Sequence, residues 1–190
     1  MTNSSADHVP EHEGKPVGPE PQMVPEQSGS DDRQRLAAAI LALHQGGQRG
    51  ANWFFWVSGL SLVNSVILLT GGQTFFVIGL GVTLVADAIA TGVAQQNPEI
   101  ATAVKVFAAG FDLLVALVVA AFGWLARKRF LAVFAVGMAL YLLDGLFLFV
   151  LFQDWMSVAF HAFALFCMWK GFNAYRQLGA LDRALQGELG

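Results

Sequence analysis

Charged residues are scarce in this chain. They make up 13% of its 190 residues, about half of the roughly 25% found in an ordinary soluble domain. Hydrophobic residues make up 55%, which is more than a soluble core of this size needs to bury. The single cysteine, Cys167, excludes a disulfide framework or a cysteine-based zinc site within one chain. With a net charge of −3 and no dense basic face, the sequence does not predict a nucleic-acid partner.

Proline is absent from most of the chain, because five of the six prolines lie within the first 30 residues. Residues 1–30 are also polar and acidic, so we expect a disordered tail. The remaining proline, Pro98, falls between apolar stretches. No apolar stretch therefore carries the usual sequence cue for the broken helices of many transporters.

Residues 31–48 are typical of a short amphipathic surface helix. Ser30 supplies a capping hydroxyl at its start, which is a favoured residue at that position. Three apolar residues fall on one face at helical spacing: Leu36, Ile40 and Leu43. We expect the glycines at positions 46, 47 and 50 to end this helix.

Five apolar stretches follow, and each is long enough to cross the roughly 30 Å hydrocarbon layer of a membrane. The predicted spans are residues 52–70, 74–93, 103–125, 130–152 and 155–173. All five tryptophans fall near span ends, where indole rings settle at membrane interfaces. Short loops between the spans favour antiparallel hairpins. The sequence therefore predicts an all-α integral membrane protein with a five-span transmembrane helix bundle and a C-terminal helical extension or tail over residues 174–190.

Orientation and partners follow from the same pattern. An odd number of spans places the two termini on opposite sides, and Lys and Arg are more frequent on the C-terminal side. The positive-inside rule then favours a cytosolic C-terminus. We expect the membrane to be a plasma membrane of the bacterial inner-membrane type. The expected partners are the lipid bilayer and either a second copy of the chain or another membrane protein.

Each predicted span carries one strongly polar residue: Asn64, Asp87, Asp112, Asp144 and His161. Ionisable side chains in hydrocarbon are costly and usually pair, neutralise or serve a function. With a rise of 1.5 Å per residue and alternating span direction, the three aspartates and His161 reach the same depth. Asn64 falls on the other side of the midplane. The sequence therefore predicts one polar layer.

Four further side chains accompany this layer: Thr83, Lys105, Tyr141 and Ser157. Tyr141 precedes Asp144 by three residues, so its hydroxyl is expected to donate to that carboxylate. Lys105 lies two turns before Asp112, and its long stem is expected to bring the ammonium group toward this aspartate.

Three functions fit this composition. The first is a structural protein or a subunit of a membrane assembly, in which the polar cluster joins helices through hydrogen bonds. The second is a proton- or cation-handling transporter or relay that uses Asp87, Asp112, Asp144, His161 and Lys105. The third is a metal-dependent hydrolase, in which the three aspartates and His161 hold a divalent metal. The sequence has no HExxH motif, so it predicts no cofactor and favours the two non-enzymatic functions, with a divalent metal and hydrolysis as the open alternative.

Overall fold

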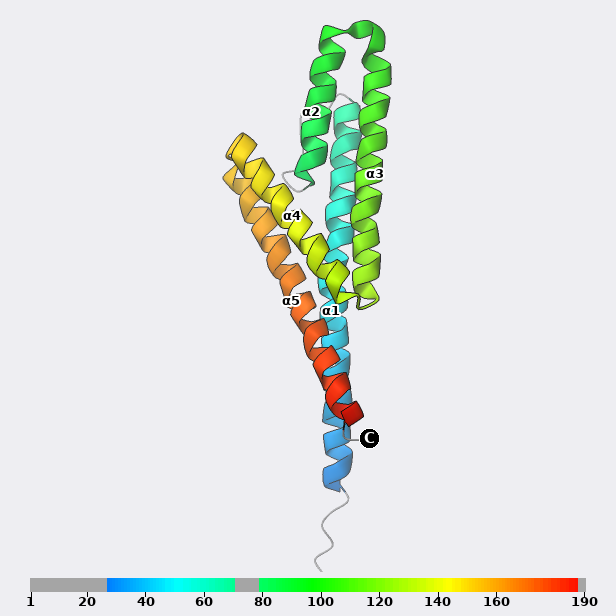
Figure 1. Ribbon diagram of the computed structural model, residues 1–190, viewed down its shortest axis with the longest axis vertical. Helices are drawn as coiled ribbons and strands as arrows, with labels where there is room; N and C mark the ends of the chain where they lie inside the picture. Colours follow the sequence, from blue (N-terminus) through cyan, green and yellow to red (C-terminus); the bar gives the residue numbers. More distant parts are fainter. Residues whose placement is uncertain (1–26, 71–78, 188–190) are drawn as a thin grey trace, which may run out of the picture.

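A computed structural model describes residues 27–70 and 79–187, and this part of the chain is almost entirely helical (Figure 1). The helices are α1 (Gln27–Leu69), α2 (Gly81–Gln96), the 3₁₀ turn η1 (Pro98–Ile100), α3 (Ala101–Arg127), α4 (Leu131–Phe152) and α5 (Trp155–Gly187). The predicted all-helical class is confirmed. The expected disordered tail, residues 1–30, lies mostly outside the described residues.

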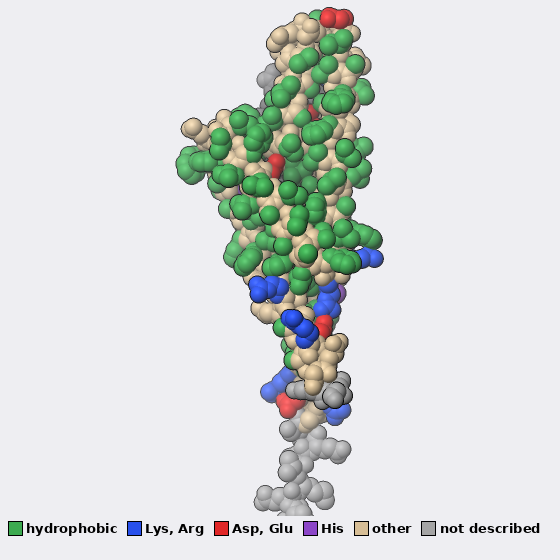
Figure 2. Space-filling model, in the orientation of Figure 1, with side chains coloured by type: hydrophobic (Ala, Val, Ile, Leu, Met, Phe, Trp, Pro, Cys, Tyr) green, Lys and Arg blue, Asp and Glu red, His purple; other side chains and the backbone are tan. Residues whose placement is uncertain are grey.

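Two segments are long and apolar enough to cross a membrane, Pro98–Arg127 and Leu131–Phe152. Their limits lie close to the predicted spans 103–125 and 130–152. Among the described residues no other helix meets the same criteria of length and composition. Large apolar side chains of α3 and α4 cover the outside of the molecule (Figure 2). These two helices support an association with a membrane but do not establish five spans.

Helix α1 continues through the glycines that were expected to end it. Gly50 crosses α5 at Gly171, and a Cβ added to either residue would lie 2.5 Å from the other's Cα. A Cβ added to Gly47 would lie at least as close to the ring of Tyr175. These glycines allow α1 and α5 to touch backbone to backbone, which offsets their helix-propensity cost of about 1 kcal/mol each. The prediction that these glycines end the helix is therefore wrong, and the predicted surface helix over 31–48 and span over 52–70 belong to one continuous helix.

Helices α1 and α2 run parallel. The hydroxyls of Ser61 and Thr83 hydrogen bond at 2.8 Å, and one turn further along both helices Ser65 interacts with Asp87. The prediction of an antiparallel first hairpin is therefore wrong. Because α2 begins only at Gly81, residues 70–80 connect the two helices. The expected start of the second span at residue 74 lies outside the described residues.

The start of α1 and the end of α5 lie at the same end of the molecule (Figure 1). The two helices meet near the middle of each, at Gly50 and Gly171, and a Cβ added to Gly46 would lie 3.3 Å from the Cβ of Ala174. The predicted C-terminal extension is helical as far as Gly187. The described ends of the chain thus disagree with the prediction of termini on opposite sides.

Aromatic side chains fill the region where α1, α4 and α5 converge. The ring of Phe134, fully buried, makes edge-to-face contacts with Phe54 at 5.5 Å, Phe172 at 5.9 Å and Tyr175 at 6.5 Å between ring centroids. Such pairs stabilise a core beyond the area that they bury. This aromatic core joins α1, α4 and α5 near the connection between α3 and α4, and the predicted polar residues lie further from that connection.

Candidate functional site

Helix α2 begins inside the bundle, and a carboxylate of α4 caps its first turn. The backbone N–H of Gly81 donates to Asp144 Oδ2 at 2.7 Å, and that of Val82 donates to Oδ1 at 2.9 Å. Helix α2 has no side-chain cap of its own, so these N–H groups would otherwise lack a partner. A negative charge at a helix N-terminus is also favourable electrostatically. Gly81 has no Cβ and can approach the Leu148 side chain of α4.

The imidazole of His161 completes this arrangement. Its Nδ1 lies 2.8 Å from the backbone carbonyl of Ser157 and its Nε2 lies 3.4 Å from Asp144 Oδ2. A carbonyl only accepts, so Nδ1 carries a proton. The ring of Tyr141 stacks on the imidazole, with centroids 4.6 Å apart and planes 20° from parallel.

A second carboxyl pair, Asp87 of α2 and Asp112 of α3, lies beside Ser65 of α1. Asp87 is 5% exposed and Asp112 is 1% exposed. Among the described residues, neither oxygen of Asp112 has a hydrogen-bond partner of acceptable geometry. A buried polar group without a partner is costly, and such groups are rare in folded proteins. The polar groups beside this carboxyl are the Asp87 carboxyl and the Ser65 hydroxyl, and that hydroxyl donates to the Ser61 carbonyl at 3.2 Å.

A cavity of about 620 Å³ adjoins Asp87. Leu148 and Phe152 of α4 form one side of it. Its polar lining residues are Asn64, Asp87, Thr91, Gln95, Asp154 and Ser157. The prediction that Asn64 lies on the other side of the midplane from Asp87 is wrong. It assumed alternating helix direction, whereas α1 and α2 are parallel.

The structure divides the predicted polar layer into two pairs. Asp144, paired with His161, meets the first turn of α2, whereas Asp87 lies six residues further along that helix. At the helical rise this is a separation of about 9 Å. Asp87 meets Asp112 at that second level.

Two of the accompanying residues, Tyr141 and Lys105, differ from the prediction. The Tyr141 hydroxyl does not donate to Asp144 and has no hydrogen-bond partner among the described residues. Lys105 is exposed, and no ion pair joins it to Asp112 in the described part of the chain. The Thr83 hydroxyl donates to the Leu80 carbonyl at 2.8 Å and does not bond an aspartate.

Sequence reasoning missed two parts of the site, namely Ser65 and the backbone of the first α2 turn. Ser61 and Ser65 are four residues apart and both buried, a spacing that also serves close helix packing. Nothing in the sequence marks Gly81 as a helix start, because the apolar pattern begins before it.

In the described ranges, no three His, Cys, Asp or Glu side chains gather as metal ligands would. No family model, curated protein or solved structure matches this chain.

Proposed function

We propose that this is an integral membrane protein that binds an exchangeable proton or a small cation between Asp87 and Asp112. In this proposal Asp144 and His161 have a different role, which is to fix the start of α2 against α4 and α5. The observation that carries the proposal is the buried pair of carboxyls itself: Asp112 is 1% exposed, the polar groups beside it are the Asp87 carboxyl and the Ser65 hydroxyl, and neither of its oxygens makes a hydrogen bond of good geometry among the described residues.

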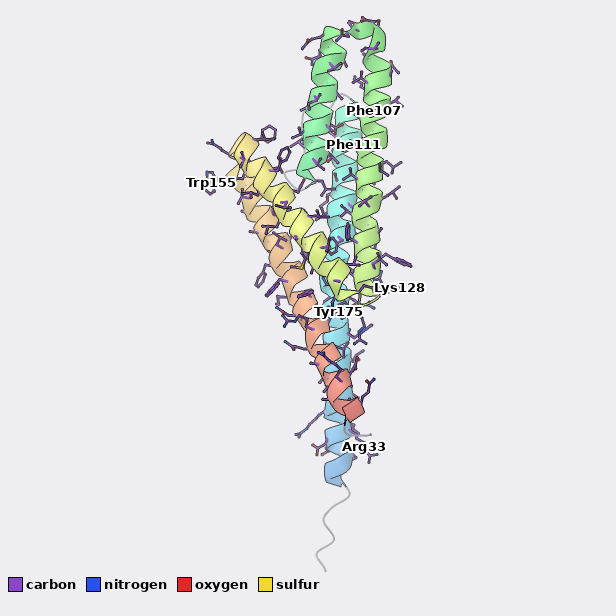
Figure 3. The ribbon with its side chains drawn as sticks, viewed as in Figure 1. Arg33, Phe107, Phe111, Lys128, Trp155 and Tyr175 are labelled. Atoms are coloured by element: carbon purple, nitrogen blue, oxygen red, sulfur yellow. The ribbon has the colours of Figure 1, made fainter. Side chains whose placement is uncertain are left out.

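The surface of the molecule supports a membrane location. Apolar side chains form a broad belt that ends in a group of Lys and Arg side chains (Figure 2). At that boundary Lys128 lies over the ring of Trp124 at 4.4 Å. Trp155, 72% exposed, lies at the far end of α4 from Lys128, and α2 and α3 continue beyond it (Figure 3). A tryptophan beside basic residues at the limit of an apolar belt, as at Trp124 and Lys128, is typical of a membrane interface.

Orientation follows from the same boundary. The basic end carries the connection between α3 and α4 and lies nearest the start of α1 and the end of α5 (Figures 1 and 2). By the positive-inside rule that end faces the cytosol. We therefore infer that both described chain ends are cytosolic, in a plasma membrane of the bacterial inner-membrane type.

The two carboxyl pairs differ in how well they are satisfied. A residue that only joins helices should have partners, as Asp144 does with two backbone N–H groups and His161. Asp112 lies beside a second carboxyl, and two neighbouring carboxylates in a low dielectric do not readily both ionise. A proton or a cation held between the two groups would supply the missing partner. Carboxyl groups inside a membrane commonly mark ion or proton pathways.

The cavity beside Asp87 supports exchange with the surroundings. It extends from Asp87 past Thr91 and Gln95, both of which are exposed. Asp112 is more deeply buried than Asp87 and is not part of the cavity lining. A proton or cation would therefore reach Asp112 by way of Asp87.

Infrared spectroscopy of the purified protein in lipid tests this proposal. We expect the wild type at neutral pH to show a carbonyl band of a protonated carboxyl, and this band should disappear in Asp112→Asn and Asp87→Asn. Asp154→Asn is the matched control, because Asp154 lines the same cavity but accepts a hydrogen bond from the Met156 N–H at 3.0 Å. The band should persist in that variant.

A second readout identifies the bound species. If the pair holds a metal cation and not a proton, the band should be absent in the presence of that cation and appear when the cation is removed. A wild-type spectrum without the band under either condition, or a band that survives in Asp112→Asn, would contradict the proposal.

A further inference from the structure

A smaller cavity, of about 270 Å³, lies between α1, α3 and α4. It shares only one lining residue, Leu80, with the cavity beside Asp87. Phe54 of α1 lies at its inner side, and α3 contributes residues between Leu114 and Phe122. Only two of its lining residues are polar, Tyr141 and Asp144 of α4. The cavity is therefore an apolar space with a polar group at one side.

This cavity is accessible from the apolar surface of the molecule. Three of its lining residues are also well exposed: Leu114 (60%), Val118 (49%) and Leu140 (49%). Helices α3 and α4 diverge from their short connection (Figure 1), and these exposed residues come from both helices. In the proposed membrane location, a ligand would enter from the lipid between α3 and α4.

The polar side of the cavity offers a hydrogen-bond donor. Tyr141 is 4% exposed, and its hydroxyl has no hydrogen-bond partner among the described residues. Stacking on His161 fixes the ring. Asp144 already accepts from the Gly81 and Val82 N–H groups and pairs with His161. The phenol O–H is a donor, so a ligand that satisfies it must present an acceptor oxygen.

Depth restricts the source of that oxygen. Helix α4 runs over 22 residues from Leu131 to Phe152, and Tyr141 is close to its middle, about 15 Å from either end at the helical rise. The ester carbonyls of phospholipids lie near the headgroups at the edges of the roughly 30 Å hydrocarbon layer. An acceptor that reaches Tyr141 must belong to a molecule that dissolves in the hydrocarbon.

We propose that this cavity binds a lipid-soluble ring compound with a carbonyl oxygen, of the quinone class, and that Tyr141 donates a hydrogen bond to that carbonyl. Ligand sites of this kind are mostly apolar with a few placed polar groups. The proposal concerns binding only and does not depend on the role of Asp87 and Asp112.

Equilibrium dialysis of the full chain in detergent micelles against menadione tests the proposal, with protein-free micelles as the blank. Methylnaphthalene, which has the same ring system without carbonyls, is the matched ligand. Tyr141→Phe removes only the hydroxyl and should weaken menadione binding about three- to tenfold, the equivalent of one neutral hydrogen bond. Methylnaphthalene should bind wild type and Tyr141→Phe equally.

The second tyrosine of the chain provides a matched variant. Tyr175 is also buried, but its hydroxyl donates to the Arg127 carbonyl at 3.4 Å and it does not line this cavity. Tyr175→Phe should bind menadione as the wild type does. If Tyr175→Phe weakens binding as much as Tyr141→Phe, the proposal is overturned.

A pair of substitutions on α3 tests the location. Val118→Trp places a large ring at the cavity mouth and should reduce menadione binding at least tenfold. Leu117→Trp is the control, because Leu117 is also well exposed on the same helix (59% against 49% for Val118) but does not line the cavity. Unchanged binding in Val118→Trp, equal wild-type affinity for menadione and methylnaphthalene, or no binding above the blank would each overturn the proposal. Equal affinity would indicate a space for acyl chains instead.

Discussion

Replacing Asp144 with alanine should detach the start of α2 from α4. The substitution removes the acceptor of the Gly81 and Val82 N–H groups and the partner of His161 Nε2. No other side chain caps α2. The variant therefore leaves two backbone donors and one ring nitrogen without their present partners.

Two typical energies set the range of unfolding free energy that Asp144→Ala is expected to lose. In soluble proteins each buried donor left unsatisfied costs about 1 to 3 kcal/mol. Interhelical side-chain bonds in membranes average only about 0.6 kcal/mol, because the unfolded chain in the bilayer finds other partners. The donors here belong to the first turn of a helix, where N–H groups have no partner within the helix even when it is isolated. We therefore expect a loss of about 2 to 4 kcal/mol for Asp144→Ala, and about half of that for Asp144→Asn, which retains one acceptor oxygen.

Reversible unfolding in mixed micelles, followed by tryptophan fluorescence and circular dichroism, measures this free energy. Asp154→Ala is the control because Asp154 also caps a helix start, but locally and at the surface. A local cap is worth about 1 kcal/mol. If Asp144→Ala costs no more than Asp154→Ala, the role of Asp144 in holding α2 is refuted.

Two further predictions concern the arrangement of the helices. Gly171→Leu should separate α5 from α1 at Gly50 and lower the unfolding free energy by about 3 kcal/mol or more, as severe overpacking does. The control Gly179→Leu, with open space around Gly179, should change the unfolding free energy by less than about 0.5 kcal/mol. The unfolding measurement described above compares the two variants, and equal losses would contradict the close crossing of α1 and α5. Cysteines introduced singly at Asp32 and Ala184 in a cysteine-free background should react with a membrane-impermeant maleimide from the same, cytosolic side, and labelling from opposite sides would refute the shared end of the chain termini.

The sequence is sufficient to predict the helices that are bounded by clear changes of composition. Helices α3 and α4 begin and end within about two residues of the predicted limits, because charged and proline-containing connections flank uniform apolar runs. The prediction that the glycines of α1 end this helix is wrong. A glycine ends a helix or lets two helices touch, and the choice depends on a partner far along the chain, here Gly171 of α5. Local propensity contains no information about that partner.

The candidate site shows the same limit. The sequence identifies Asp87, Asp112, Asp144 and His161 as the polar residues of the apolar stretches, and all four are found in contact as two pairs. Their pairing was not predictable, because one reversed helix direction changes the relative depth of every residue that follows. The parallel course of α1 and α2 also explains why Asn64 joins the Asp87 cavity.

Helix α2 connects the two pairs mechanically, and this gives the Asp144→Ala variant a second use. Asp87 lies six residues from the capped Gly81 on one continuous helix, so a shift of the helix start moves the Asp87 carboxyl relative to Asp112. The infrared band of the protonated carboxyl should then change frequency or disappear in Asp144→Ala, although neither Asp87 nor Asp112 is altered. If the unfolding free energy falls and the band stays unchanged, α2 is positioned mainly by its contacts with α1 and α3, among them the bond between Ser61 and Thr83. The Asp144 pair would then stabilise the bundle without positioning the Asp87–Asp112 pair.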